Sequence, residues 1–175
     1  MAQIDRFSPE QRERWAAFIR WLNPQSDPRA ARLMDDFQAV AHQIYQLSEA
    51  SLASADLSYA EFRVLMNLMF SEWAGECDGL NPSVISAHQG TSRNTISALI
   101  RNLESKRLVT RLLDEDDRRR FRIHLTDAGR EKVRAHSAQF GQLIHQLFGA
   151  LSDAEVETLS GLLRALDQRA QATKE

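Results

Sequence analysis

The stretch from Thr91 to Thr126, TSRNTISALIRNLESKRLVTRLLDEDDRRRFRIHLT, decides the fold class of this chain. Its first part carries apolar residues at helical spacing, and two short segments with alternating apolar residues follow, separated by a charged turn. The pattern predicts a helix over residues 91–106 and strands over 108–113 and 121–125. A polar helix beside an arginine-tipped hairpin is typical of a winged helix that reads DNA.

The helix expected over residues 91–106 has two contrasting faces. At about 100° per residue, its large apolar side chains form one stripe that faces a core: Ile96, Leu99, Ile100 and Leu103. The opposite face is small and polar, which suits entry into a major groove about 12 Å wide. The residues expected to contact DNA are Ser92, Arg93, Asn94, Thr95, Ser97 and Arg101, with Asn102 flanking them.

The short helix expected over residues 81–90, which ends at Gly90, supplies the first half of a helix-turn-helix. A surface helix that is polar only because it is solvated is the alternative interpretation of residues 91–106. The position of this helix between the short helix and the basic hairpin favours the DNA-reading interpretation.

The turn between the two expected strands alternates in charge. Asp117 can accept hydrogen bonds from the turn or pair with Arg119, which would aim that guanidinium in a fixed direction. A narrow minor groove attracts such an arginine, and Arg118, Arg120 and Arg122 are placed to contact phosphates. A solvated charge run is again the alternative. Three acids in this turn have no assigned role: Asp114, Glu115 and Asp116.

Outside this stretch the chain is predicted to be helical. Apolar spacing and capping residues such as Ser58-x-x-Glu61 and Ser152-x-x-Glu155 indicate the boundaries. The further helices are expected over residues 9–22 and 29–53, from residue 58 through Met69 with a loop at 75–79, and over 126–151 and 152–171. The fold class is therefore mainly α with a small β-hairpin. The apolar stripes of the first two and last two helices exceed what one small lobe covers, which predicts an intermolecular helical bundle.

Charge is distributed unevenly along the 175 residues, although the net charge is only −2. The net charge is −5 over residues 1–80, +4 over residues 81–126 and −1 over residues 127–175. Local basic density, rather than the sum over the chain, governs attraction to a phosphate backbone. The middle third is therefore the part expected to meet nucleic acid.

Several classes of protein are excluded or disfavoured by composition. The single cysteine, Cys77, rules out a disulfide within the chain and a cysteine-cluster metal site. The five histidines show no ligand spacing, and no phosphate loop, nucleophile elbow or paired-carboxylate site stands out. We expect no enzyme activity, no cofactor and no metal. No apolar leader segment or run of about 18 apolar residues occurs, so a cytoplasmic protein without membrane contact is expected.

Several motifs in combination resemble the MarR-type winged-helix transcriptional regulators. They are LSYAEFRVL at 57–65, the 91–111 segment, Asp117-x-Arg119, Leu125-Thr126-x-x-Gly129 and LSDAEVETLSGLLRAL at 151–166. Three positions depart from the pattern of the family. Ser105-Lys106-Arg107 lacks the usual glycine, Glu115 stands where a proline is common, and Gln89 replaces an apolar residue.

The resemblance implies a homodimeric repressor whose two recognition helices enter successive major grooves of a pseudo-palindrome in double-stranded DNA. It also implies that Arg119 reaches the minor groove with Asp117 supporting it, and that a small aromatic effector releases the protein. The expected regions are an N-terminal helical extension (1–28), a dimerisation helix (29–56), a winged helix-turn-helix lobe (57–126) and C-terminal dimerisation helices (127–175). A winged helix that binds protein and a constitutive DNA binder without effector remain alternatives.

Overall fold

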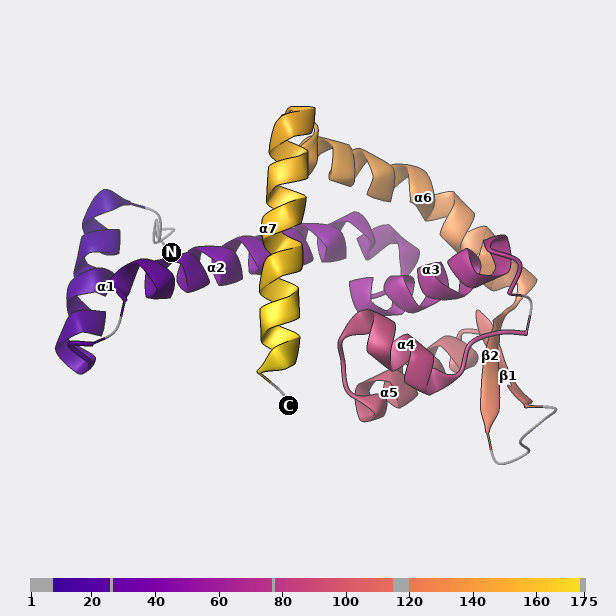
Figure 1. The fold of residues 1–175 in the computed structure, drawn as a ribbon. Coiled ribbons are helices and arrows are strands. Elements are labelled where there is room, and N and C mark those ends of the chain that lie inside the picture. The colour runs from indigo at the N-terminus through magenta and orange to yellow at the C-terminus, as the bar shows by residue number, and fades with distance from the viewer. Residues whose placement is uncertain (1–7, 26, 77, 115–119, 174–175) are drawn as a thin grey trace. The chain divides into compact units, whose positions relative to one another are not determined.

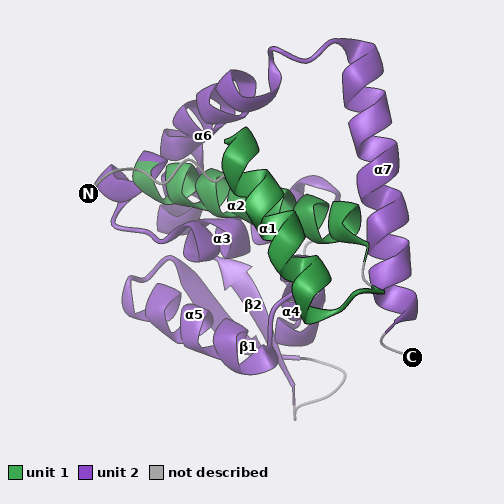
Figure 2. Cartoon of the chain, turned by 90° about the vertical axis from the view of Figure 1, so that its left-hand side faces the viewer, with its two compact units in different colours: residues 1–50 green, residues 51–175 purple. Residues whose placement is uncertain are grey.

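The computed structural model describes residues 8–25, 27–76, 78–114 and 120–173 (Figure 1). The chain divides into two compact units, residues 1–50 and residues 51–175, which Figure 2 colours separately. None of the helices in the described ranges has both the length and the apolar character needed to cross a membrane.

The first unit consists of α1 (Pro9–Leu22) and most of α2 (Pro28–Ser51). The α1 helix begins as its sequence predicts, because the Ser8 side chain accepts a hydrogen bond from the Gln11 amide and Pro9 occupies the first helical position. An ion pair of 3.8 Å between Arg12 and Asp36 joins the two helices. Large apolar side chains on both helices are exposed within this unit: Trp15, Phe18, Trp21, Leu22, Leu33, Met34, Phe37, Val40 and Leu47.

The second unit holds the remaining helices and a two-stranded sheet, which confirms the mainly helical fold class. Its elements are η1 (Ala53–Ala55), α3 (Tyr59–Trp73), α4 (Pro82–Gln89), α5 (Arg93–Ser105), β1 (Val109–Leu113), β2 (Phe121–Leu125), α6 (Asp127–Phe148) and α7 (Asp153–Ala172). The α3 helix begins with the expected capping box at Ser58 and Glu61. It ends before Gly75, whose φ of +89° is a conformation that glycine adopts readily.

The wing is an antiparallel hairpin in which Val109 pairs with Leu125 and Leu113 pairs with Phe121. A backbone bridge not predicted from the sequence extends it. The amides of Leu80 and Ile123 donate to each other's carbonyl oxygens at 3.0 and 2.9 Å. The segment before α4 is therefore tied to the hairpin, which fixes where the helix-turn-helix begins relative to the wing.

The apolar stripe predicted on α5 forms part of the core of the second unit. Ile96, Ile100 and Leu103 are buried, and Leu99 packs against the same cluster. The core also receives buried side chains from α3, α4, β2 and α6: Phe62, Leu65, Leu68, Ile85, Ile123 and Val133. Burial of this one stripe orients α5, so that its opposite face is left at the surface.

Two turns around α5 use the left-handed backbone region. Gly90 ends α4 with a φ of +62°, as expected for a residue without a Cβ. After α5, Arg107 adopts a φ of +56° at the turn where the sequence lacks the usual glycine. The turn therefore keeps its conformation without glycine, and the Arg107 carbonyl accepts a hydrogen bond of 2.8 Å from the Thr126 hydroxyl.

Gly129 provides a test of the packing between α6 and the hairpin. A Cβ at this position would collide with the backbone carbonyl of Leu108, which cannot move as a flexible side chain would. We expect Gly129→Ala to lower the free energy of unfolding by about 1–3 kcal/mol, measured by urea denaturation. Gly141→Ala on the same helix is the control, because nothing lies within 4 Å of its added Cβ. That variant should gain up to about 1 kcal/mol, and equal effects of the two would refute the packing argument.

Candidate DNA-binding surface

The polar face of α5 is open to solvent. Arg93, Asn94 and Arg101 are exposed, as are Ser92 and Thr95 at the start of the helix, and Ser97 is half-buried. Ser92 caps the helix by accepting a hydrogen bond of 3.1 Å from the Thr95 amide, and the two hydroxyl oxygens lie 2.8 Å apart. The capping pair fixes the direction in which the first turn of α5 presents its polar side chains.

Asn102, which the sequence placed beside the outer face, is bound to α3 instead. Its side-chain amide donates to Glu61 at 2.7 Å. Glu61 is only 3% exposed and also accepts from the Ser58 amide at 2.8 Å and from the Lys106 ammonium at 3.3 Å. One buried carboxylate therefore caps α3 and holds the C-terminal half of α5. The sequence revealed the capping box but not this longer-range role, because Glu61 and Asn102 are 41 residues apart.

Gln89, which stands where an apolar residue is usual in the MarR-type regulators, also makes a contact between helices. Its side-chain amide donates to the Ala60 carbonyl at 3.4 Å, which joins the end of α4 to the first turn of α3. The polar residue therefore forms a specific contact where an apolar one is usual in the family. All three helices of the helix-turn-helix region meet at the start of α3.

The predicted wing residues are only partly within the described ranges. Asp117, Arg118 and Arg119 lie outside them, and Arg120 is exposed at the start of the returning chain. The role of Asp114, unassigned from the sequence, is structural. It is 7% exposed and accepts a hydrogen bond of 2.7 Å from the Arg122 guanidinium across the hairpin. This acid is therefore neutralised internally, so its charge opposes DNA much less than the sequence suggested.

A polar hollow of about 410 Å³ lies where α5, the start of α4 and the hairpin meet. It brings together three residues predicted to contact DNA, Arg93 and Ser97 of α5 and Arg120 of the wing. Three polar residues that the sequence analysis did not select also line it: Asn81, Ser83 and Arg111. The Arg111 guanidinium lies 5.4 Å from the centre of the Phe121 ring and donates to Glu104 at 3.0 Å.

Strand alternation did not single out Arg111, because it would share a face with the buried Val109, whereas every residue of β1 after Val109 is exposed. Three guanidinium groups and several hydroxyl and amide groups around one hollow make a surface suited to a phosphate oxygen. Asn94, Thr95 and Arg101 do not line this hollow and lie elsewhere on the exposed part of α5.

The α4–turn–α5 pair followed by a two-stranded wing defines a winged helix-turn-helix protein. Residues 55–120 match the family model described as MarR family. Two curated relatives agree with this match. The transcriptional repressor MprA of Escherichia coli (strain K12) is 31% identical over 94 residues, which are 54% of this chain and 53% of the relative. A putative transcriptional regulatory protein for the hcr operon of Thauera aromatica is 37% identical over 89 residues, 50% of this chain and 53% of the relative.

Among solved structures, the complex of S. aureus MepR with DNA is similar, with a TM-score of 0.69 and 28% identity over 77% of this chain and 93% of that one. Over residues 55–120 the chain is therefore similar to the MarR family of winged helix-turn-helix transcriptional regulators. The family is one of regulators and not of enzymes. The chain spans about half the length of the curated relatives it matches.

Lys106→Met tests the contact between α3 and α5. It removes the cation beside Glu61 and leaves a buried carboxylate with fewer partners. We expect a loss of about 1–3 kcal/mol in the free energy of unfolding, measured by urea denaturation. Arg101→Met is the matched control on the exposed face of the same helix and should change stability by less than about 0.5 kcal/mol. Equal stability of the two variants would rule out an anchoring role for Glu61 and Lys106.

Proposed function

We propose that this protein is a homodimeric, effector-responsive repressor that binds a pseudo-palindromic operator in double-stranded DNA. The observation that carries the DNA-binding part is the hollow between α5 and the wing, where Arg93, Arg111 and Arg120 converge beside the exposed polar face of α5. The relationship to MepR, whose complex with DNA has been solved, supports the same assignment. Arginines clustered at a recognition helix and a wing provide the positive surface that phosphate contacts need.

In the proposed complex, α5 and the wing contact different parts of the DNA. The exposed groups of α5 would read base edges in the major groove, with Asn94 and Arg101 offering amide and guanidinium donors. Arg93 and Arg120 would hold phosphates at the hollow. The wing residues Asp117 and Arg119 keep their proposed roles as support and minor-groove anchor.

The dimer is supported by apolar side chains that the monomer leaves uncovered. On α7, Val156, Leu159, Leu162, Leu163 and Leu166 recur at helical spacing and are all exposed. The first unit likewise exposes the aromatic side chains of α1 and the apolar line of α2. Such stripes at both ends of a chain favour burial against a second copy.

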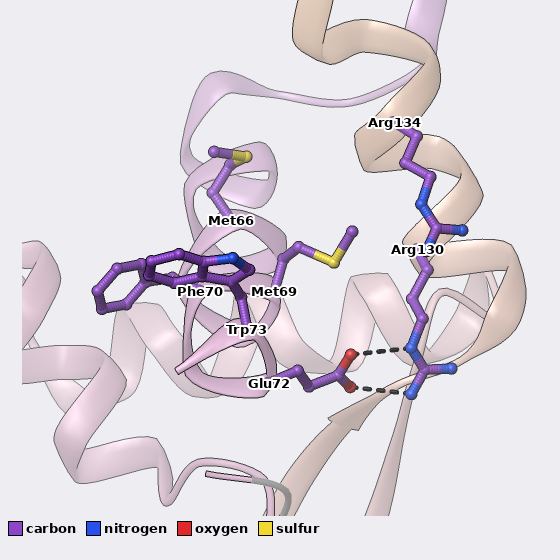
Figure 3. A pocket seen from close by; sticks show the side chains of 7 residues that line it. All are labelled: Met66, Met69, Phe70, Glu72, Trp73, Arg130 and Arg134. Carbon is purple, nitrogen blue, oxygen red and sulfur yellow. Dashed lines mark hydrogen bonds and ion pairs between the residues drawn. The ribbon is translucent and has the colours of Figure 1, made fainter. Parts of the chain in front are cut away.

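Two other functions share this fold. A winged helix that binds protein would need no arginine cluster at the recognition helix and wing, so the hollow favours DNA. A constitutive DNA binder would need no ligand cavity, and the cavity of about 530 Å³ between the aromatic side chains of α3 and the arginines of α6 favours an effector (Figure 3).

Arg93→Ala tests DNA binding by α5. We expect about tenfold weaker binding to a fragment of the native upstream region, measured by fluorescence anisotropy over a series of salt concentrations. Loss of one phosphate contact should also reduce the slope of log K against log salt by about 1. The melting temperature should not change, because the Arg93 side chain is exposed.

Arg164→Ala, which removes an exposed arginine of α7, is the control for Arg93→Ala and should bind DNA as the unmodified protein does. Absence of any salt-sensitive, sequence-preferring binding by the unmodified protein would reject the DNA-binding proposal. The protein-binding alternative would then be favoured.

Leu162→Glu tests the dimer. The side chain is 60% exposed in the single chain, so a glutamate there should leave the fold of the monomer intact. Two like charges placed in an apolar interface should shift the mass in sedimentation equilibrium from dimer towards monomer. Glu157→Gln, an exposed change on the same helix, should leave the mass unchanged. A Leu162→Glu variant that remains fully dimeric would exclude α7 from the interface.

A further inference from the structure

The hollow between α5 and the hairpin has polar walls that belong neither to the recognition helix nor to the tip of the wing. One wall is formed by Asn81 and Ser83 at the start of α4, and another by Arg111 of β1. Arg93 of α5 lines the same hollow. Neither Asn81 nor Arg111 is among the DNA contacts proposed above.

Asn81 uses only one end of its side-chain amide to cap α4. Its Oδ1 accepts hydrogen bonds from the Ser83 amide at 3.1 Å and from the Ser83 hydroxyl at 2.9 Å. Because the oxygen is directed at the helix, the amide nitrogen with its two N–H donors is directed away from it. Within the described ranges no hydrogen bond or ion pair engages this nitrogen. Asn81 is half-buried at the hollow, so these donors are available to an acceptor there.

The position of Asn81 is fixed relative to the hairpin. The preceding residue, Leu80, exchanges two backbone hydrogen bonds with Ile123 of β2, at 3.0 and 2.9 Å. Gly79 permits this close approach, because a Cβ at that position would lie 2.6 Å from the Ile123 carbonyl oxygen. The start of α4 and the returning strand of the wing therefore hold the walls of the hollow at a constant separation.

Arg111 is held in place by two neighbours without using all of its donors. One nitrogen of the guanidinium donates to Glu104 at 3.0 Å, and the group lies 5.4 Å from the centre of the Phe121 ring. A guanidinium carries five N–H donors, so this single bond leaves most of them open. Arg93 has no hydrogen bond or ion pair in the part of the chain that the structure describes. The hollow therefore combines ordered donors with a positive charge that Glu104 only partly neutralises.

We propose that this hollow holds one phosphate of the DNA backbone, with Asn81 and Arg111 as its ligands beside Arg93, an inference that rests on the proposed DNA-binding function. Phosphate oxygens accept hydrogen bonds from guanidinium groups and from side-chain amides alike. The donors come from three elements that the Leu80–Ile123 bridge and the core keep together. A phosphate is thus bound without rearrangement of the protein.

A phosphate at this place would fix how α5 sits in the major groove. Contacts to the backbone set the register and orientation of a protein on the duplex but carry no sequence information. Asn81 and Arg111 are therefore positioning residues, and their loss weakens binding to every duplex by the same factor. The preference for one sequence stays with the exposed groups of α5, such as Asn94 and Arg101.

Asn81→Asp separates the phosphate contact from helix capping. Aspartate caps a helix as well as asparagine does, so the melting temperature should not fall. Aspartate has no N–H donor and brings a negative charge to the hollow. We therefore expect about tenfold weaker binding of the full-length protein to a fragment of the native upstream region, measured by fluorescence anisotropy. Ser8→Asp places the same charge at the N-cap of α1 and should bind DNA as the unmodified protein does.

Arg111→Gln is the second variant, and it does not alter a helix cap. We expect about tenfold weaker binding and a decrease of about 1 in the slope of log K against log salt. Arg111→Lys should restore most of the affinity, because an ammonium group still pairs with phosphate. An unrelated duplex of equal length should lose the same factor with each variant, as a backbone contact requires. Arg164→Gln, which removes an exposed cation of α7, should leave both affinities unchanged.

The proposal is overturned if either Asn81→Asp or Arg111→Gln binds DNA as tightly as the unmodified protein. Weakening confined to the native fragment would also overturn it, because a base and not a phosphate would then occupy the hollow. Equal weakening by Ser8→Asp and Asn81→Asp would show that added charge alone explains the loss. If Arg93→Ala weakens binding while these variants do not, the proposed function stands without this site. Absence of DNA binding by the unmodified protein would reject the function and the site together.

Discussion

The buried carboxylate of Glu61 is the interaction on which the winged helix-turn-helix part of this protein depends. It accepts hydrogen bonds from the first turn of its own helix and from two side chains of the recognition helix. A carboxylate that is 3% exposed is stable only when its oxygens are paired, so each partner is held in place by the cost of leaving it unpaired. The apolar stripe of α5 sets which face is buried, and this polar contact sets the direction of its C-terminal half.

The charge of the surface between α5 and the wing depends on the residues nearby and not on the net charge of the chain. The net charge is −2, yet arginines from two elements converge at the hollow between α5 and the wing. Acids in the same region are paired within the protein, as Asp114 with Arg122 and Glu104 with Arg111 show. Internal pairing reduces the repulsion that these acids would exert on a phosphate backbone, and it orders the arginines at the base of the wing. A chain of negative net charge can therefore still present a cationic surface between α5 and the wing.

Helix α3 connects two surfaces of different chemistry. Its first turn is bound to the recognition helix, and its last two turns form the aromatic wall of the cavity beside α6. The Glu72–Arg130 pair joins α3 to α6 at the edge of that cavity. A helix that is bonded at both ends transmits a displacement rather than absorbing it, because its own backbone hydrogen bonds resist bending. One helix therefore joins the cavity beside α6 to the contact with α5.

The sequence by itself determined the elements, because local rules govern them. Helical spacing placed the buried stripe of α5, capping residues marked the starts of α3, α5, α6 and α7, and alternation identified the hairpin. Tertiary structure alone decided which polar residues meet. The sequence did not indicate that Asn102 faces Glu61, that Leu80 bridges Ile123, or that Arg111 joins Arg93 at one hollow. Such pairings join residues far apart in the chain, and the packing of the apolar core, which periodicity does not encode, brings them together.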